Sequence, residues 1–271
     1  MSKARDGVED LKTIDANLAA KAPLASPVFT GNVGIGVTPE SWTVFKVLQL
    51  GGESVIRANT DHNEDFAVGR NMYYDGSWKR INSAHAQEYL QDNSGNHLFR
   101  VAASGAADSA ISWNTAMTID NAGVVTKPLQ PAFSACLSTS HTFAVGTTTI
   151  VFDSEIFDQN SDFNAPSATF TAPVTGKYQF NISIRIDNMD QGASYYRLML
   201  KTSNGDYQPI IIGAGSVFNS DLSYFPFTMP VLADMDAGDT AYVQFQVNGG
   251  AAQAQIHASR PNANFSGYLV A

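Results

Sequence analysis

Alternation of apolar and polar residues is clearest in the second half of the chain. Over residues 178–186, Tyr, Phe and Ile occupy every second position, and Gln, Asn, Ser and Arg lie between them. Residues 242–247 repeat the pattern with Val243, Phe245 and Val247 as the apolar positions. Because successive side chains of a β-strand point to opposite faces, this period of two predicts strands with one buried and one solvated face.

Residues 222–232 differ, because both sets of alternate positions are largely apolar. In a single soluble domain, such a strand would expose an apolar strip to water. The pattern therefore predicts that one face of this strand contacts a neighbouring copy of the chain. The candidate trimer-interface residues are Tyr224, Phe225, Phe227 and Met229.

Only residues 5–21 show a helical pattern. Leu11, Ile14 and Leu18 follow one another at spacings of three and four residues, as on one face of a helix. They suit a short coiled coil that adds to the trimer interface, and an amphipathic helix lying on another surface is an equally good interpretation. Pro23 and Pro27 end the segment, because proline lacks an amide donor and favours extended backbone before it.

Between residues 28 and 127, short extended runs are separated by turn sequences. Residues 73–78 favour a β-hairpin, because Asp75 and Gly76 suit the positive φ values of a tight primed turn. The pattern predicts a small β domain of about seven strands. Its core is expected to contain the three tryptophans, Trp42, Trp78 and Trp113.

Composition limits the classes of partner. The 271-residue chain has 15% charged residues and a formal net charge of −9. With no basic cluster to displace counterions, nucleic-acid binding is not expected. With no apolar run of about 18 residues, membrane insertion is not expected either. The charged N-terminal sequence has no secretion signal, so we expect synthesis in a cytoplasm.

A change in amino-acid composition near residue 131 suggests a domain boundary. Twelve of 16 Phe and seven of ten Tyr lie beyond it, and Pro128 and Pro131 make the preceding connector stiff. The expected organisation is an attachment segment over residues 1–30, a β-rich shaft domain over 31–127 and a head over 128–271. Cys136, the only cysteine, is expected to be a small buried apolar residue.

Two phrases resemble the linker and shaft sequences of bacteriophage tail-fibre and receptor-binding proteins. They are APLASPVFTGNVGIGVTP at residues 22–39 and MTIDNAGVV at residues 117–125. The resemblance implies a virion protein that is made in the host cytoplasm and carried as a fibre.

Five further phrases resemble, in order and spacing, the C1q-like globular domain of the complement and tumour necrosis factor superfamily. They are AFSA at 132–135, VFD at 151–153, FTAPVTGKYQF at 170–180, AGD at 237–239 and FSGYL at 265–269. The resemblance implies a ten-stranded jelly roll that forms a tight homotrimer, with both ends of the domain at its base. A long Gln- and Ala-rich segment before the last strand departs from the family.

In such a jelly roll the strands reverse direction one after another, so alternate loops lie at the apex. These loops are residues 187–193, 214–221 and 249–262, and loops on a rigid scaffold commonly carry binding. Their amide and carboxylate groups could bind sugar hydroxyls, and the alternative is that they are only solvated loop tips. The candidate receptor-binding residues are Asp187, Asn188, Asp190, Gln191, Asn219, Asp221, Gln255, His257 and Arg260.

No pattern in the sequence indicates catalysis, a cofactor or a metal site. The five histidines have no ligand spacing and none pairs with Cys136. Asp234, Asp236 and Asp239 resemble the start of a calcium loop, but the glutamate required at its twelfth position is missing. We interpret this segment as a turn at the base of the head.

The sequence therefore predicts a trimeric viral fibre protein, of a bacteriophage, that is not an enzyme. Its N-terminal segment is expected to bind a tail or capsid protein of the virion, and its head a host-surface glycan or protein. The alternative is a capsid-attached head fibre or decoration protein whose C-terminal domain mainly drives trimerisation. A bacterial surface adhesin fits less well, because the sequence shows no export signal.

Overall fold

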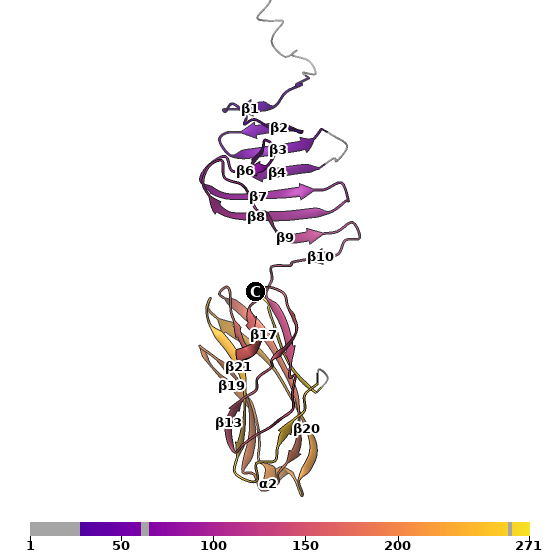
Figure 1. The fold of residues 1–271 in the computed structure, drawn as a ribbon, viewed down its shortest axis with the longest axis vertical. Helices are drawn as coiled ribbons and strands as arrows, with labels where there is room; N and C mark the ends of the chain where they lie inside the picture. The colour runs from indigo at the N-terminus through magenta and orange to yellow at the C-terminus, as the bar shows by residue number, and fades with distance from the viewer. Residues whose placement is uncertain (1–27, 61–64, 260–261) are drawn as a thin grey trace, which may run out of the picture. The chain divides into compact units, whose positions relative to one another are not determined.

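A computed structural model describes residues 28–60, 65–259 and 262–271, and the chain forms two compact units, Met1–Lys127 and Pro128–Ala271 (Figure 1). The described residues form β-strands, with one 3-10 helix and one short α-helix. The helix expected over residues 5–21, with Leu11, Ile14 and Leu18, lies outside the described residues. The protein is all-β.

The described part of Met1–Lys127, called unit 1 below, contains one eight-stranded sheet and a separate hairpin. β1 runs parallel to β2, and all other neighbours in the sheet are antiparallel. The order is β1 (Val33–Ile35), β2 (Phe45–Leu50), β3 (Ser54–Asn59), β4 (Phe66–Arg70), β7 (Ala84–Gln91), β8 (His97–Gly105), β9 (Asn114–Ile119) and β10 (Val125–Thr126). The hairpin consists of β5 (Tyr73–Tyr74) and β6 (Trp78–Lys79).

The prediction of about seven strands for unit 1 is wrong, because the described residues contain ten. Four of these, β1, β5, β6 and β10, have two or three residues and are too short to show an alternating pattern. The hairpin within residues 73–78 is confirmed. Its loop has three residues rather than two, and only Gly76 among them has a positive φ, of 120°.

The core of unit 1 covers one face of its sheet. Trp42 lies within this cluster and Trp78 and Trp113 pack against it, which confirms the expected tryptophan core. Arg57 lies in the same layer with only 1% of its surface exposed, and its guanidinium stacks 4.7 Å from the Phe45 ring and 4.8 Å from the Trp78 ring. This buried cation forms an ion pair with Glu88 at 3.1 Å.

Residues Pro128–Ala271, called unit 2 below, form two packed sheets. The first contains β12 (His141–Thr142), β22 (Gln255–Ile256), β17 (Gly176–Met189), β23 (Ala263–Leu269), β11 (Ala132–Cys136) and β14 (Ser154–Asp158), with β20 (Leu222–Met235) paired to β17. The second contains β15 (Phe163–Asn164), β16 (Thr169–Thr171), β21 (Thr240–Asn248), β18 (Tyr195–Thr202) and β19 (Gly205–Ile212), with β13 (Gly146–Thr149) paired to β21. Ala165–Ser167 form the 3-10 helix and Ala214–Val217 form the helix α2.

Ten of these thirteen strands have three or more residues, which confirms the ten-stranded jelly roll. The alternation expected over residues 178–186 is also confirmed, because Tyr178, Phe180 and Ile182 are buried and the residues between them are not. The inner faces of the two sheets enclose a core rich in stacked Phe and Tyr rings. Cys136 is a buried free thiol, as expected.

The two ends of unit 2 lie side by side. The amide of Lys177 donates to the Ala271 carbonyl at 2.7 Å, and Gln130 Nε2 donates to the Leu269 carbonyl at 3.2 Å. Figure 1 shows this end of unit 2, marked C, opposite the end that carries α2. The α2 end is called the apex below, and the end with Ala271 the base.

Candidate binding surfaces

Hydrogen bonds join the three apex loops to one another. Asp221 accepts from the Gln191 amide through Oδ1 and from Gln253 Nε2 through Oδ2, both at 2.9 Å. Gln191 Nε2 in turn donates to the Phe218 carbonyl at 3.0 Å. One residue from each loop thus meets at the Asp221 carboxylate, and segments that are distant in sequence form one polar surface.

Asp190 fixes the loop between β17 and β18. Its Oδ1 accepts from the Gly192 amide at 2.7 Å, and its Oδ2 accepts from the Ala251 amide in the third loop. Gly250 has a φ of +74°, and a Cβ at this position would lie 2.7 Å from the Ala193 amide nitrogen. Glycine is therefore required where the third loop passes closest to the first.

An open cavity of about 360 Å³ lies at the apex, lined by Asn188, Asp221, Leu222, Ser223 and Gln253. Hydrogen bonds from the Gln191 amide and from Gln253 lower the pKa of Asp221, so the carboxylate is charged at neutral pH. In the part of the chain that the structure describes, the side chains of Asn188 and Asn219 have no hydrogen-bond partner and are exposed. The cavity thus combines the Asp221 carboxylate with the free amide of Asn188 and the hydroxyl of Ser223, a set that suits hydroxyl-bearing ligands.

Of the nine candidate receptor-binding residues, the structure brings together Asn188, Asp190, Gln191 and Asp221, and places Asn219 in the neighbouring loop. Sequence reasoning missed Gln253 and Ser223, which line the same cavity. Gln253 lies within a predicted apex loop, but nothing in its spacing distinguishes it from the other glutamines there.

The remaining candidate receptor-binding residues lie outside the apex cavity or are already paired with another residue of the domain. Asp187 is only 7% exposed and forms a bidentate pair with Arg185, at 2.8 and 3.1 Å, so its prediction as a free contact residue is wrong. Gln255 lies in β22 opposite Asp187, and His257 Nδ1 lies 3.3 Å from Ser140 Oγ, beyond the cavity. Arg260 lies outside the described residues.

The outward face of the seven-stranded sheet is a second candidate surface. It exposes large apolar side chains on three strands: Tyr224 and Leu232 of β20, Tyr268 of β23 and Phe157 of β14. The outward positions of β17 carry Gln179, Asn181 and Ser183, with one charged residue at each end. Both end charges are neutralised within the unit, Lys177 by Asp234 and Arg185 by Asp187.

This face corrects the sequence-based interface residues. Tyr224 is 66% exposed and remains available. Phe227 and Met229 are 1% exposed each and point into the core of their own unit, so their prediction as interface residues is wrong. Phe225 is partly buried against the same core. Because the strand is apolar on both sides, its sequence does not show which side faces inward.

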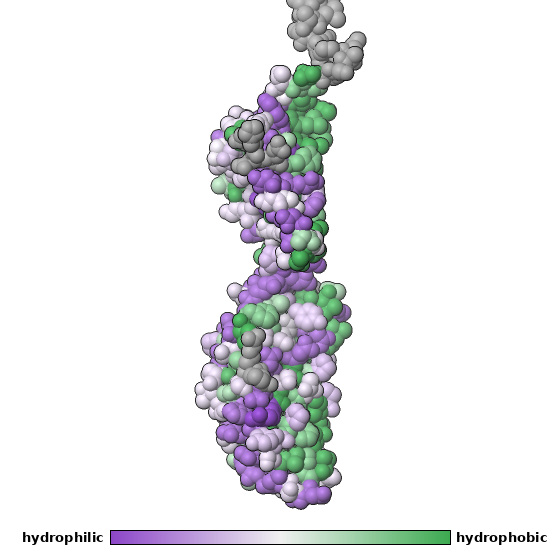
Figure 2. All heavy atoms as spheres, turned by 90° about the vertical axis from the view of Figure 1, so that its right-hand side faces the viewer, coloured by the Kyte–Doolittle hydropathy of each residue, from purple (hydrophilic) through white to green (hydrophobic). Residues whose placement is uncertain are grey.

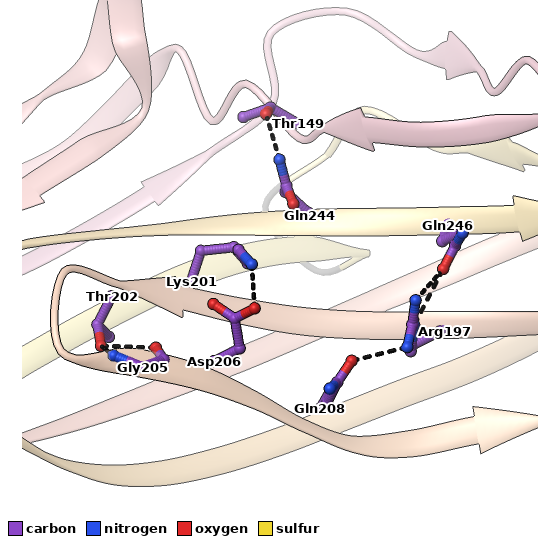
Figure 3. A network of polar contacts seen from close by, with 9 residues as sticks. All are labelled: Thr149, Arg197, Lys201, Thr202, Gly205, Asp206, Gln208, Gln244 and Gln246. Carbon is purple, nitrogen blue, oxygen red and sulfur yellow. Dashed lines mark hydrogen bonds and ion pairs between the residues drawn. The ribbon is translucent and has the colours of Figure 1, made fainter.

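The outer face of the six-stranded sheet is polar instead (Figure 3). Arg197 lies between two glutamines, donating from Nε to Gln246 at 3.0 Å and from Nη1 to Gln208 at 2.8 Å. Lys201 pairs with Asp206, and Gln244 donates to Thr149 Oγ1 at 3.3 Å. The polar groups of these residues form hydrogen bonds and an ion pair with one another across β13, β18, β19 and β21, as is typical of a face exposed to water.

A comparison with protein-family models finds the C1q domain over residues 132–270. The chain belongs to the C1q-domain family. The matched region is nearly the whole of unit 2 and includes both candidate surfaces. C1q domains as a family are non-enzymatic binding and trimerisation modules.

Several solved structures are similar to part of the chain at low identity. The globular domain of zebrafish complement 1qA protein is 19% identical over 52% of this chain and 98% of its own, with a TM-score of 0.40. Murine APRIL is 10% identical over 52% and 99%, with a TM-score of 0.39. PRD1 vertex protein P5 is 15% identical over 62% and 88%, with a TM-score of 0.38. No curated protein sequence matches the chain.

Among residues 28–60, 65–259 and 262–271, no three or more His, Cys, Asp or Glu side chains come together in an arrangement that could hold a metal ion. Asp236 and Asp239 lie in the turn after β20, where the Asp236 amide donates to Asp239 Oδ2 at 2.7 Å. No helix within the described residues is long and apolar enough to cross a membrane.

Proposed function

We propose that the chain is a trimeric bacteriophage fibre protein whose C1q domain binds a glycan on the host-cell surface. In this proposal residues 1–30 attach the fibre to a virion tail or capsid protein, and residues 31–127 form the shaft. The linker and shaft phrases at residues 22–39 and 117–125 support the phage assignment. The observation that carries the proposal is the contrast between the two outer faces of the C1q domain, one polar and satisfied, the other apolar.

The apolar face supports trimerisation. Tyr224, Leu232 and Tyr268 are each about half exposed or more, at 66%, 58% and 47%. Several large apolar side chains exposed on one face of a sheet indicate an interaction site in a soluble protein. Because the charges at the ends of β17 are already paired within the unit, a second copy can approach the face without desolvating an unpaired charge.

Analytical ultracentrifugation of the full chain tests the oligomer. We expect a trimer at micromolar concentration, and Tyr224→Glu combined with Leu232→Glu should convert it to monomers. The matched control is Gln208→Glu, which adds a charge on the polar face of the same domain and should leave the trimer intact. A wild-type chain that sediments as a monomer would rule out the trimeric fibre.

The apex cavity supports the receptor role, because the free amide of Asn188 and the charged carboxylate of Asp221 meet there at the end of the domain farthest from the connector. Avidity from three heads per fibre would allow each site to be weak. Glycan-array binding and host adsorption by the full chain should both be lost in Asn188→Ala combined with Gln253→Ala. Asn204→Ala, at the base of the domain, should bind like the wild type; adsorption that survives the apex double variant would contradict the receptor role.

One observation favours the alternative, a capsid-attached decoration protein. Both carboxylate oxygens of Asp190 and of Asp221 already accept hydrogen bonds from within the loops, which leaves fewer groups for a ligand. Immunogold labelling of virions separates the two functions: label at the tail tip supports the receptor-binding fibre, and label over the capsid supports decoration.

A further inference from the structure

An uncharged apolar row crosses the sheet of unit 1 at right angles to its strands. Each member lies directly opposite the next in the strand register, so the row continues through seven strands. From β1 to β9 its members are Val33, Leu48, Ile56, Val68, Tyr89, Phe99 and Met117. This set is called the apolar row below.

The apolar row lies on the face of the sheet opposite the tryptophan core. Phe45, Val47 and Val55, the core residues of β2 and β3, alternate in sequence with the row residues Leu48 and Ile56. Val68 is 45% exposed and Phe99 is 40% exposed, and they line an open hollow of about 380 Å³ with Tyr89 and Val101. Figure 2 shows apolar residues gathered along one side of unit 1, at the right-hand edge of the view.

The chemistry of this face selects an apolar, uncharged partner. The seven positions of the apolar row contain no charged residue, while Lys46 and Arg70 flank the row on either side. An apolar centre with a polar rim is usual for a protein–protein interface. The row has no charge with which to recognise an acidic or basic ligand.

The size of the row indicates that its partner is already held nearby. Seven strands at about 4.8 Å spacing give a row about 29 Å long, and three outward positions per strand make the face roughly 400 Å². This is about half of the roughly 800 Å² that each partner buries in a typical stable interface. A face this small associates durably only at high local concentration, and a trimer of C1q domains holds other copies of unit 1 at effective concentrations of about a millimolar.

We propose that the apolar row is the contact surface between copies of this chain, so that three sheets pack their rows around a common axis. This inference rests on the proposed trimer and adds a second contact, in the shaft, to the contact in the C1q domain. Because the row runs across the strands, the rows of the copies lie alongside one another over their whole length, with Val68 of each copy at the same height. Both faces of the sheet are then covered, one by the tryptophan core and the other by the neighbouring copies.

Cross-linking of the full chain with a short bis-maleimide tests this arrangement. The native thiol, Cys136, is buried, so the wild type should react little. Val68→Cys places a thiol on the row with a small change in side-chain volume, and Ser77→Cys, exposed in the loop of the hairpin that packs with the tryptophan core, is the matched control. We expect Val68→Cys to form covalent dimers and trimers roughly a hundredfold faster than Ser77→Cys, at a rate independent of protein concentration, because the reacting thiols are held together.

Sedimentation of the same samples separates the two proposals. A trimer whose Val68→Cys thiols cross-link no faster than the control overturns the shared row and leaves the C1q trimer standing. A trimer in which Val68→Cys is also protected from a monofunctional maleimide shows that something other than a second row covers the face, which overturns the inference as well. A monomeric chain contradicts both proposals. A cross-linking rate that rises with protein concentration shows that the thiols meet by collision between separate particles, which overturns the shared row.

Discussion

The two units bury their apolar side chains in different ways. Unit 2 closes two sheets around a core of stacked aromatic rings, so each sheet has one inner and one outer face. Unit 1 has a single sheet with a small core on one face and the apolar row on the other. Unit 2 therefore closes its main core within one chain and exposes apolar side chains only on one outer face, whereas unit 1 leaves the back of its main sheet without a second layer.

The interiors differ in polarity as well. Burial lowers the pKa of the Arg57 guanidinium, and its Nε and Nη1 atoms have no hydrogen-bond partner among the described residues. The rings of Phe45 and Trp78, the carboxylate of Glu88 and the charge of Asp65 offset the burial of this cation. Glu88 also pairs with Arg100, so unit 1 holds a buried carboxylate that two arginines share, and its loss is costly.

The largest effect is expected from a cavity in the core of unit 2. Phe180 is fully buried among Phe133, Phe170 and Phe265, and Phe180→Ala should lower the free energy of unfolding of unit 2 by about 3–5 kcal/mol. Chemical denaturation and calorimetry both measure this loss, and Tyr242→Ala, at a half-buried position on the polar outer face of β21, is the control for loss of an aromatic side chain. A shift of the unit 1 transition by the same amount would show that the two cores are not independent.

The second prediction concerns the buried ion pair of unit 1. Glu88→Gln removes the carboxylate that pairs with both Arg57 and Arg100 and should destabilise unit 1 by about 3 kcal/mol, with unit 2 unchanged. The matched control, Glu53→Gln, removes a partner of the more exposed Arg70 and should cost at most about 1 kcal/mol. Equal effects of the two variants in a denaturant titration would mean that Arg57 is less dependent on its partner than its burial implies.

A smaller effect is expected at the last strand of the C1q domain. A Cβ at Gly267 would lie 2.7 Å from Phe180 Cδ1 and 2.8 Å from Phe133 Cε1, so Gly267→Ala forces two rings to move. We expect a cost of about 1–3 kcal/mol in unfolding free energy. Gly205→Ala is the control, because a Cβ there meets no atom within 4 Å; a neutral Gly267→Ala would show that the core can shift more easily than its packing suggests.

The smallest effect is an acid dependence at the apex. The pKa of Asp221 is lower in the folded chain than its ordinary value of 3.8, so the stabilisation from its hydrogen bonds is complete above that value. It is lost as the pH falls below 3.8 through the lower folded pKa. The difference in unfolding free energy between the wild type and Asp221→Asn should therefore be constant near neutral pH and shrink in denaturation curves below pH 3.8. A difference that grows as the pH falls would mean that folding raises the pKa of Asp221.

Sequence reasoning succeeded where the pattern is local. The alternation over residues 178–186 and the ordered phrases up to FSGYL at 265–269 were enough to predict the jelly roll. The strand over residues 222–232 was recognised, but Phe227 could not be told from Tyr224 because both faces of the strand are apolar. The choice of inward face depends on packing against β17, which the sequence of one strand does not contain.

The surfaces were harder to predict for the same reason. Val33, Leu48 and Ile56 of the apolar row have no fixed spacing in sequence, and only the strand register brings them into line. At the apex, loop assignment from strand direction found Asp221, while Gln253 needed the fold to identify it. Asp187 was misjudged because its partner, Arg185, lies on the same face two residues earlier in the strand.

The two prolines of β20 carry one more consequence. β20 is an edge strand whose single neighbour is β17, and amides along a strand alternate between its two sides. Pro226 and Pro230 have no amide hydrogen, so they occupy positions that face the free edge of the sheet. Another strand that tried to pair with this edge would therefore lack two backbone hydrogen bonds. A particle that displays many such edges close together is thereby protected from uncontrolled strand-by-strand aggregation.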